Sequence, residues 1–105
     1  MLGVGSTTEH EMTMRYLLLG CDPAGDCPLW VEGEGPRNSI PVPLSPAVKA
    51  DLLHWNERMS EIVRNPDRYS SADLNALRAK LNGEGLGLAR RVAEERDAKV
   101  RYLPA

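Results

Sequence analysis

Two cysteines and two histidines are the side chains of this chain best suited to bind a metal ion. Cys21 and Cys27 flank a short turn, whereas His10 and His54 lie at no regular spacing from them. A zinc signature holds four ligands at short, regular spacings, so we expect no metal site and no cofactor. We interpret the cysteines as small thiols at the two ends of a hairpin, reduced in the cytoplasm.

His54 invites a catalytic role, because it stands beside Trp55 and less than one helical turn before Glu57. However, the apolar stripe of the surrounding segment includes Leu52 and Trp55, which places His54 on the polar side of a helix. No serine or cysteine nucleophile is tied to it by a motif. We therefore expect a surface histidine and a protein that is not an enzyme.

The segment Asn82–Gly87 (NGEGLG) has the glycine content of a phosphate-binding loop at a helix start. A dinucleotide-binding fingerprint requires a strand directly before the loop, and here the preceding residues, ALRAKL, are typical of a helix. No Lys-Ser or Lys-Thr pair completes a P-loop. We favour a helix break with close packing. The alternative is a small ligand- or phosphate-binding domain, or an enzyme, that uses the Asn82–Gly87 turn.

Trp30 is the residue most typical of a contact surface. Alternation along residues 29–32 places Trp30 on the face of a strand opposite to Leu29 and Val31. If those two face the helices, Trp30 lies on the open side of a sheet, where aromatic side chains supply contact area at low entropic cost. The alternative is that the loop of residues 33–44 covers this side. The candidate partner-binding residues are Tyr16, Trp30, Glu32 and Glu34.

The placement of these candidate residues on one face depends on the predicted sheet. Residues 14–21 and 29–32 are typical of two strands that form a β-hairpin around the turn DPAGDC. Residues 99–103 predict a last strand. Residues 33–46 are rich in proline, which indicates an irregular connection to the first helix.

Three helical segments are predicted after this connection. Ser45-Pro46 is typical of a helix start, and the apolar stripe that follows predicts a helix as far as Asn65-Pro66. Residues 70–81 predict a second segment, and residues 82–97 a third one that starts at the Asn-Gly pair. We therefore expect an α+β fold: a small three-stranded sheet, made of the N-terminal β-hairpin and the C-terminal strand, with two to three helices packed on one face.

Length and composition indicate one domain. The chain has 105 residues, 42% of them hydrophobic and 27% charged, which is ordinary for a globular protein. Residues 1–13 are small and polar and lack periodicity, so we expect a flexible leader there and a single α/β domain over residues 14–105.

The charge pattern argues against nucleic-acid binding. The net charge is -2, and the first 44 residues are the more acidic part of the chain. A nucleic-acid-binding protein normally carries a basic excess, so we expect no nucleic-acid partner. No apolar stretch is long enough to span a membrane, and no secretory signal is evident, so we expect a cytoplasmic protein.

Several short motifs are similar to those of a known group of proteins. They are Pro28-Leu29-Trp30, Leu44-Ser45-Pro46, Trp55-Asn56, Glu84–Ala89 and Val100-Arg101-Tyr102. With these residues the last three-quarters of the chain resembles small uncharacterised bacterial α/β proteins, common in actinobacteria, some of which are encoded near polymorphic toxins and regarded as their immunity proteins. The chain departs from this pattern by the helical segment at residues 70–81. The motifs are structural, so the resemblance implies an interaction protein and supplies no catalytic residues.

We therefore expect a non-catalytic protein-binding module, in its most concrete form an immunity or antitoxin-like inhibitor that occludes the active site of a partner protein. The acidic N-terminal part would suit a basic partner, such as a nuclease, through electrostatic steering. Self-association through the face of the sheet is a further possibility.

Overall fold

The structure, a computed structural model, describes residues 16–37 and 39–105. The predicted leader, residues 1–13, lies outside the described residues, as does the predicted start of the domain at Met14. The elements in chain order are β1 (Leu17–Leu19), β2 (Leu29–Val31), α2 (Pro46–Arg64), the 3-10 turn η1 (Pro66–Arg68), α3 (Ser71–Arg96) and β3 (Val100–Tyr102).

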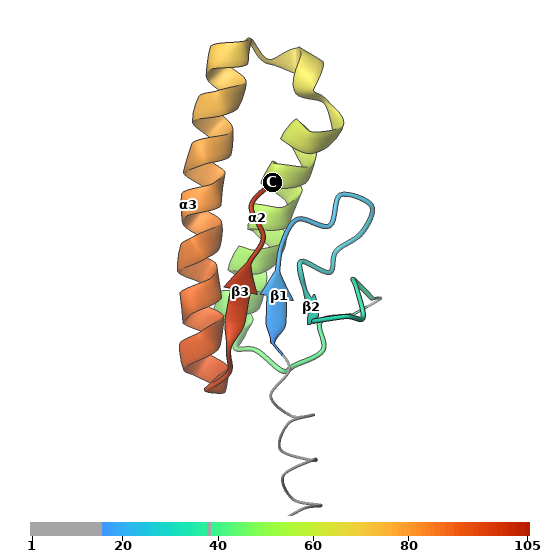
Figure 1. Cartoon of the computed structure of the whole chain (residues 1–105), viewed down its shortest axis with the longest axis vertical. Helices are drawn as coiled ribbons and strands as arrows, with labels where there is room; N and C mark the ends of the chain where they lie inside the picture. Colours follow the sequence, from blue (N-terminus) through green and yellow to red (C-terminus); the bar gives the residue numbers. More distant parts are fainter. Residues whose placement is uncertain (1–15, 38) are drawn as a thin grey trace, which may run out of the picture.

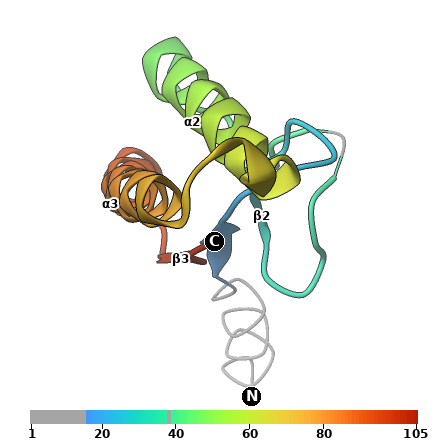
Figure 2. The same ribbon diagram turned by 90° about the horizontal axis from the view of Figure 1, so that it is seen from above.

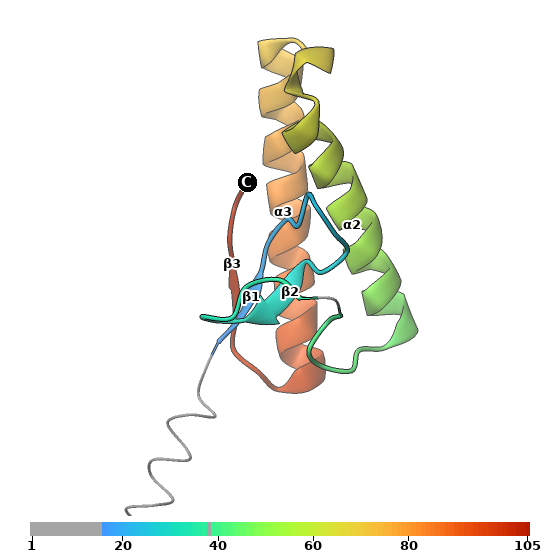
Figure 3. The same ribbon diagram turned by 90° about the vertical axis from the view of Figure 1, so that its right-hand side faces the viewer.

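The three strands form one mixed sheet in the order β2-β1-β3 (Figure 1). The central strand β1 pairs antiparallel with β2 and parallel with β3. Both helices lie on the same side of this sheet (Figures 2 and 3). The predicted α+β fold is therefore confirmed, with two helices, and each strand is shorter than its predicted range. No helix in the described part of the chain combines the length and apolar character needed to cross a membrane.

The core lies between the sheet and the two helices. Leu17, Leu19 and Leu29 are buried because alternation along β1 and β2 turns them toward the helices. They meet buried apolar side chains of both helices, which in α2 recur every three or four residues. The helical members are Val48, Leu52, Trp55, Met59 and Ile62 of α2 and Leu81, Leu88, Ala89 and Val92 of α3.

Helix α2 begins and ends as the sequence predicts. The Ser45 hydroxyl accepts a hydrogen bond from the Val48 N–H at 3.4 Å, and Pro46 occupies the first turn, where no N–H partner is needed. The helix ends at Arg64, and Asn65 adopts a non-helical conformation before Pro66.

The predicted break at Asn82-Gly83 is wrong, because α3 continues without interruption from Ser71 to Arg96. An internal glycine costs a helix about 1 kcal/mol relative to alanine, which packing against a neighbour can offset. Gly85 shows the reason for one such glycine: a Cβ there would lie 2.7 Å from Cζ of Tyr102 in β3. The glycine-rich segment thus lets β3 approach the middle of α3.

Candidate protein-binding face

The outer face of the sheet carries the side chains that point away from the helices. Leu18 of β1 is in register with Trp30 of β2 and with Arg101 of β3, so these three residues form one row across the sheet. Leu17 and Leu19, on either side of Leu18 in β1, are buried against the core. Because successive side chains of a strand point to opposite faces, Leu18 and the rest of its row point outward. Trp30 is only partly buried. Figure 1 views the strands from this side, in front of α2.

Tyr16 and Glu32 lie on the same face and are joined through Arg101. The guanidinium of Arg101 stands 4.8 Å from the centre of the Tyr16 ring, and its Nη1 lies 3.5 Å from Oε2 of Glu32. The Lys99 ammonium is 5.8 Å from the same ring. These cation–π contacts and the ion pair fix Tyr16 and Glu32 beside the row of Leu18 and Trp30.

The remaining candidate, Glu34, lies in the turn after β2 and pairs with Arg37 at 3.3 Å. The structure thus brings Tyr16, Trp30 and Glu32 together and places Glu34 at the β2 edge. Lys99 and Arg101 were not among the predicted site residues, because only the parallel pairing of β3 with β1 brings them to this face. The outer face therefore carries charges of both signs.

The loop after β2 leaves β1 and β3 open on this side. Its residues Ile40, Val42 and Leu44 pack against the core, and Ser39 O accepts a hydrogen bond from the Cys27 thiol at 3.4 Å. Among the described residues, no segment passes in front of β1 and β3 in Figure 1.

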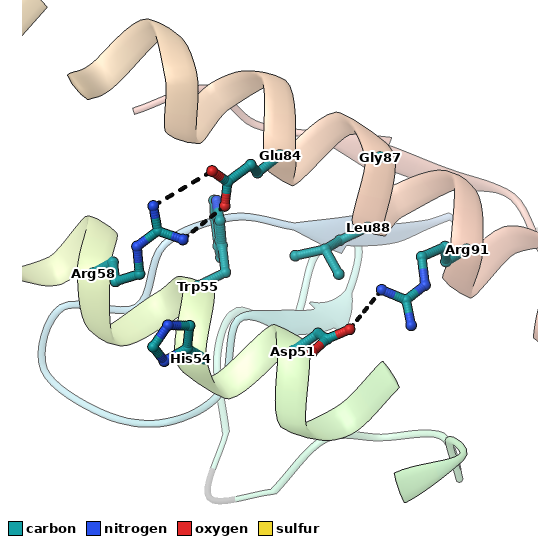
Figure 4. A pocket seen from close by; sticks show the side chains of 8 residues that line it. All are labelled: Asp51, His54, Trp55, Arg58, Glu84, Gly87, Leu88 and Arg91. Atoms are coloured by element: carbon teal, nitrogen blue, oxygen red, sulfur yellow. Dashed lines mark hydrogen bonds and ion pairs between the residues drawn. The ribbon is translucent and has the colours of Figure 1, made fainter. Parts of the chain in front are cut away.

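A second surface feature lies between the two helices, on their side away from the sheet (Figure 4). It is a hollow of about 390 Å³ that includes His54 and Trp55. Two ion pairs cross it from helix to helix, Arg58 to Glu84 at 2.8 Å and Arg91 to Asp51 at 2.7 Å. These pairs neutralise the charges of the hollow and join the helices. His54 is exposed, as predicted for a surface histidine.

The two cysteines are free thiols near the turn between β1 and β2. Cys27 is buried and donates a hydrogen bond to Leu29 O at 3.2 Å, whereas the sulfur of Cys21 lies 3.4 Å from the Ser60 hydroxyl. Burial raises the pKa of the Cys21 thiol, which disfavours the nucleophilic thiolate. In the part of the chain that the structure describes, no three histidine, cysteine or acidic side chains gather as metal ligands.

Asn56 is a structural residue that the sequence analysis missed. It is buried, and its side-chain oxygen accepts the Asp22 N–H at 2.7 Å while its amide group donates to Asp22 O and Gly25 O. Asn56 therefore fastens the turn between β1 and β2 to α2. The signal for this role is its position next to Trp55, at the border of the apolar stripe.

The Asn82–Gly87 segment lies inside α3, so the helix start on which phosphate binding depends does not exist there. The Asn82 side-chain oxygen instead accepts hydrogen bonds from the Tyr102 hydroxyl and from the Ala105 N–H. The close packing predicted for this segment is present at Gly85. The helix break and the turn predicted with it are wrong.

The outer face of the sheet thus combines partly exposed aromatic side chains with charged ones, and no described segment passes in front of β1 and β3. No protein-family model, curated protein or solved structure matches this chain.

Proposed function

We propose that this protein is a non-catalytic protein-binding module and that the outer face of the sheet is its contact surface. The observation that carries the proposal is the one-sided fold: both helices cover one side of the sheet and leave Trp30 partly exposed on the other. Tryptophan, tyrosine and arginine are the residue types that dominate binding energy at protein interfaces. This face carries one residue of each of these three types: Trp30, Tyr16 and Arg101.

In its concrete form, the proposed module is an immunity or antitoxin-like inhibitor that occludes the active site of a partner protein in the cytoplasm. The resemblance described above and the two free thiols, which suit a reducing compartment, support this form. Arg101 and Lys99 lie beside Glu32, so we propose a partner with complementary charges of both signs. Charge complementarity then orients the partner, and steering by acidic residues alone becomes a minor contribution.

Two other functions have less support. Self-association would use the same face, because a second copy offers the same aromatic side chains. Ligand binding at the Asn82–Gly87 turn loses its physical basis, since that segment is the middle of α3.

The proposal is tested by finding the partner and measuring the affinity of variants for it. Affinity purification of the tagged chain with mass spectrometry identifies the partner, and titration calorimetry then compares Trp30→Ala with the unchanged protein. Truncation of a central aromatic contact residue weakens binding by about 2 kcal/mol or more, which is about thirtyfold in Kd. Leu86→Ala is the matched control, because Leu86 is 49% exposed on α3, away from the face.

A second variant separates binding from folding, because Trp30 also packs near Gly20. Arg101→Ala removes an exposed side chain and should leave the unfolding midpoint unchanged while it weakens binding. Wild-type affinity in both variants would contradict the proposed face. A dimer in sedimentation experiments that dissociates on Trp30→Ala would favour self-association instead.

A further inference from the structure

An apolar hollow adjoins Trp30 at the end of the sheet where β1 leads into the turn. Its volume is about 420 Å³, within the range of small-molecule sites. Its lining includes the large apolar side chains of Trp30, Ile62, Val63 and Leu103. Val63 and Leu103 are 40% and 38% exposed, so two of the three exposed large hydrophobic side chains of the described chain lie in this hollow.

Arg78 of α3 reaches the same hollow and has no partner there. Its Nε atom is buried and makes no hydrogen bond, and across residues 16–37 and 39–105 its guanidinium group forms no ion pair. Arg58 and Arg91, by contrast, each pair with a carboxylate. A buried N–H without an acceptor is unfavourable, so Arg78 is prepared to receive an anionic group.

The surroundings of Arg78 restrict the charge of the anionic ligand that it can bind. Arg78 is the one cationic side chain among the described residues that line the hollow. A nucleotide or another polyanion needs several cations, whereas a carboxylate matches a single guanidinium in a two-bond geometry. The apolar side chains around it favour a ligand whose remaining part is hydrocarbon.

We propose that this hollow binds a small monocarboxylate with an apolar chain. The carboxylate pairs with Arg78, and the chain lies against Trp30, Val63 and Leu103. This site shares Trp30 with the proposed contact row, but its charged group, Arg78, belongs to α3, on the helical side of the sheet.

Octanoate is the probe, and titration calorimetry with the full chain measures its binding. We expect octanoate to bind at least tenfold more tightly than 1-octanol, which lacks the charge, and than acetate, which lacks the chain. Arg78→Met keeps an unbranched apolar side chain and removes the charge, so it should lose at least tenfold in affinity for octanoate. Arg90→Met, at an exposed arginine of the same helix, is the matched control and should bind as the wild type does.

Stability supplies a second readout. Because Arg78 pairs with no described residue, Arg78→Met should unfold without ligand at a midpoint no lower than that of the wild type. Octanoate should raise the midpoint of the wild type and of Arg90→Met, and should raise that of Arg78→Met less. Undetectable octanoate binding, equal binding of octanoate and 1-octanol, or unchanged binding in Arg78→Met would overturn the proposal. Arg78→Met leaves every residue of the contact row unchanged, so its affinity for the protein partner should equal that of the wild type, and this measurement distinguishes failure of the ligand site from failure of the outer face.

Discussion

Three glycines at alternate positions of α3 should respond in opposite ways to replacement by alanine. At Gly83 and Gly87 an added Cβ would meet no atom within 4 Å apart from the adjacent backbone of its own helix, so alanine should raise the free energy of unfolding by about 0.5–1 kcal/mol at each site. At Gly85 the Cβ would lie 2.7 Å from Cζ and 2.8 Å from the hydroxyl oxygen of Tyr102. The Tyr102 ring must then move away from the helix.

That movement removes two interactions of Tyr102. One is the hydrogen bond from its hydroxyl to Asn82, and the other is the edge-to-face contact with Trp55, whose ring centre is 6.0 Å away at an angle of 67°. Each contributes about 1 kcal/mol, so the loss is about 2 kcal/mol. The higher helix propensity of alanine stabilises the folded state by about 1 kcal/mol relative to glycine. We therefore expect Gly85→Ala to be less stable than the wild type by about 1 kcal/mol, and less stable than Gly83→Ala by about 2 kcal/mol.

Urea unfolding followed by circular dichroism measures these differences, and Gly83→Ala is the control because it makes the same chemical change two residues away. In a Tyr102→Ala background the cost of Gly85→Ala should disappear, since the obstructing ring is gone. A Gly85→Ala protein as stable as Gly83→Ala would refute the packing of β3 against Gly85.

Three further predictions concern other contacts. Asn56→Ala should lower the free energy of unfolding by about 2 kcal/mol in urea, because it leaves polar groups of the β1–β2 turn without partners, whereas Asn75→Ala at an exposed site should not. Burial raises the pKa of Tyr102 from 10.0 to about 12, so the folded state holds this proton more tightly than the unfolded state. Stability should therefore be complete below about pH 10 and fall as the pH rises toward about 12, and a Tyr102→Phe protein with the same decline would contradict this assignment. Cys21, with its raised pKa, should react with iodoacetamide more slowly than the same thiol in urea, and buried Cys27 should react more slowly still; mass spectrometry that found equal rates for the two folded thiols would count against their environments.

Helix α2 could be predicted because its signals are local. Ser45 and Pro46 lie next to each other at its start, and the apolar stripe of its core face is complete within the helix. Helix α3 ends at Arg96, one residue before the predicted end at Asp97. The continuity of α3 was not predictable, since it depends on Tyr102, which is distant in sequence and packs on Gly85 only in the folded state.

The candidate face was predictable only in the part that the β-hairpin supplies. Alternation placed Trp30 and Glu32 on one side of the sheet, and this follows from a single strand. The contribution of β3 required the strand order, which no local pattern contains.

The parallel pairing of β1 with β3 joins the two ends of the described chain, which predicts a late step in folding. Leu17 pairs with Val100, so almost the whole described chain forms a loop that must close before these strands bond, at a high entropic cost. The contacts between α2 and α3 involve residues nearer in sequence and can form first. Their hairpin then brings the flanks of the strands together and shortens the effective loop. The loop-closure argument therefore predicts that the β1–β3 pairing, which adds Lys99 and Arg101 to the outer face, forms after the local β1–β2 hairpin and the α2–α3 contacts.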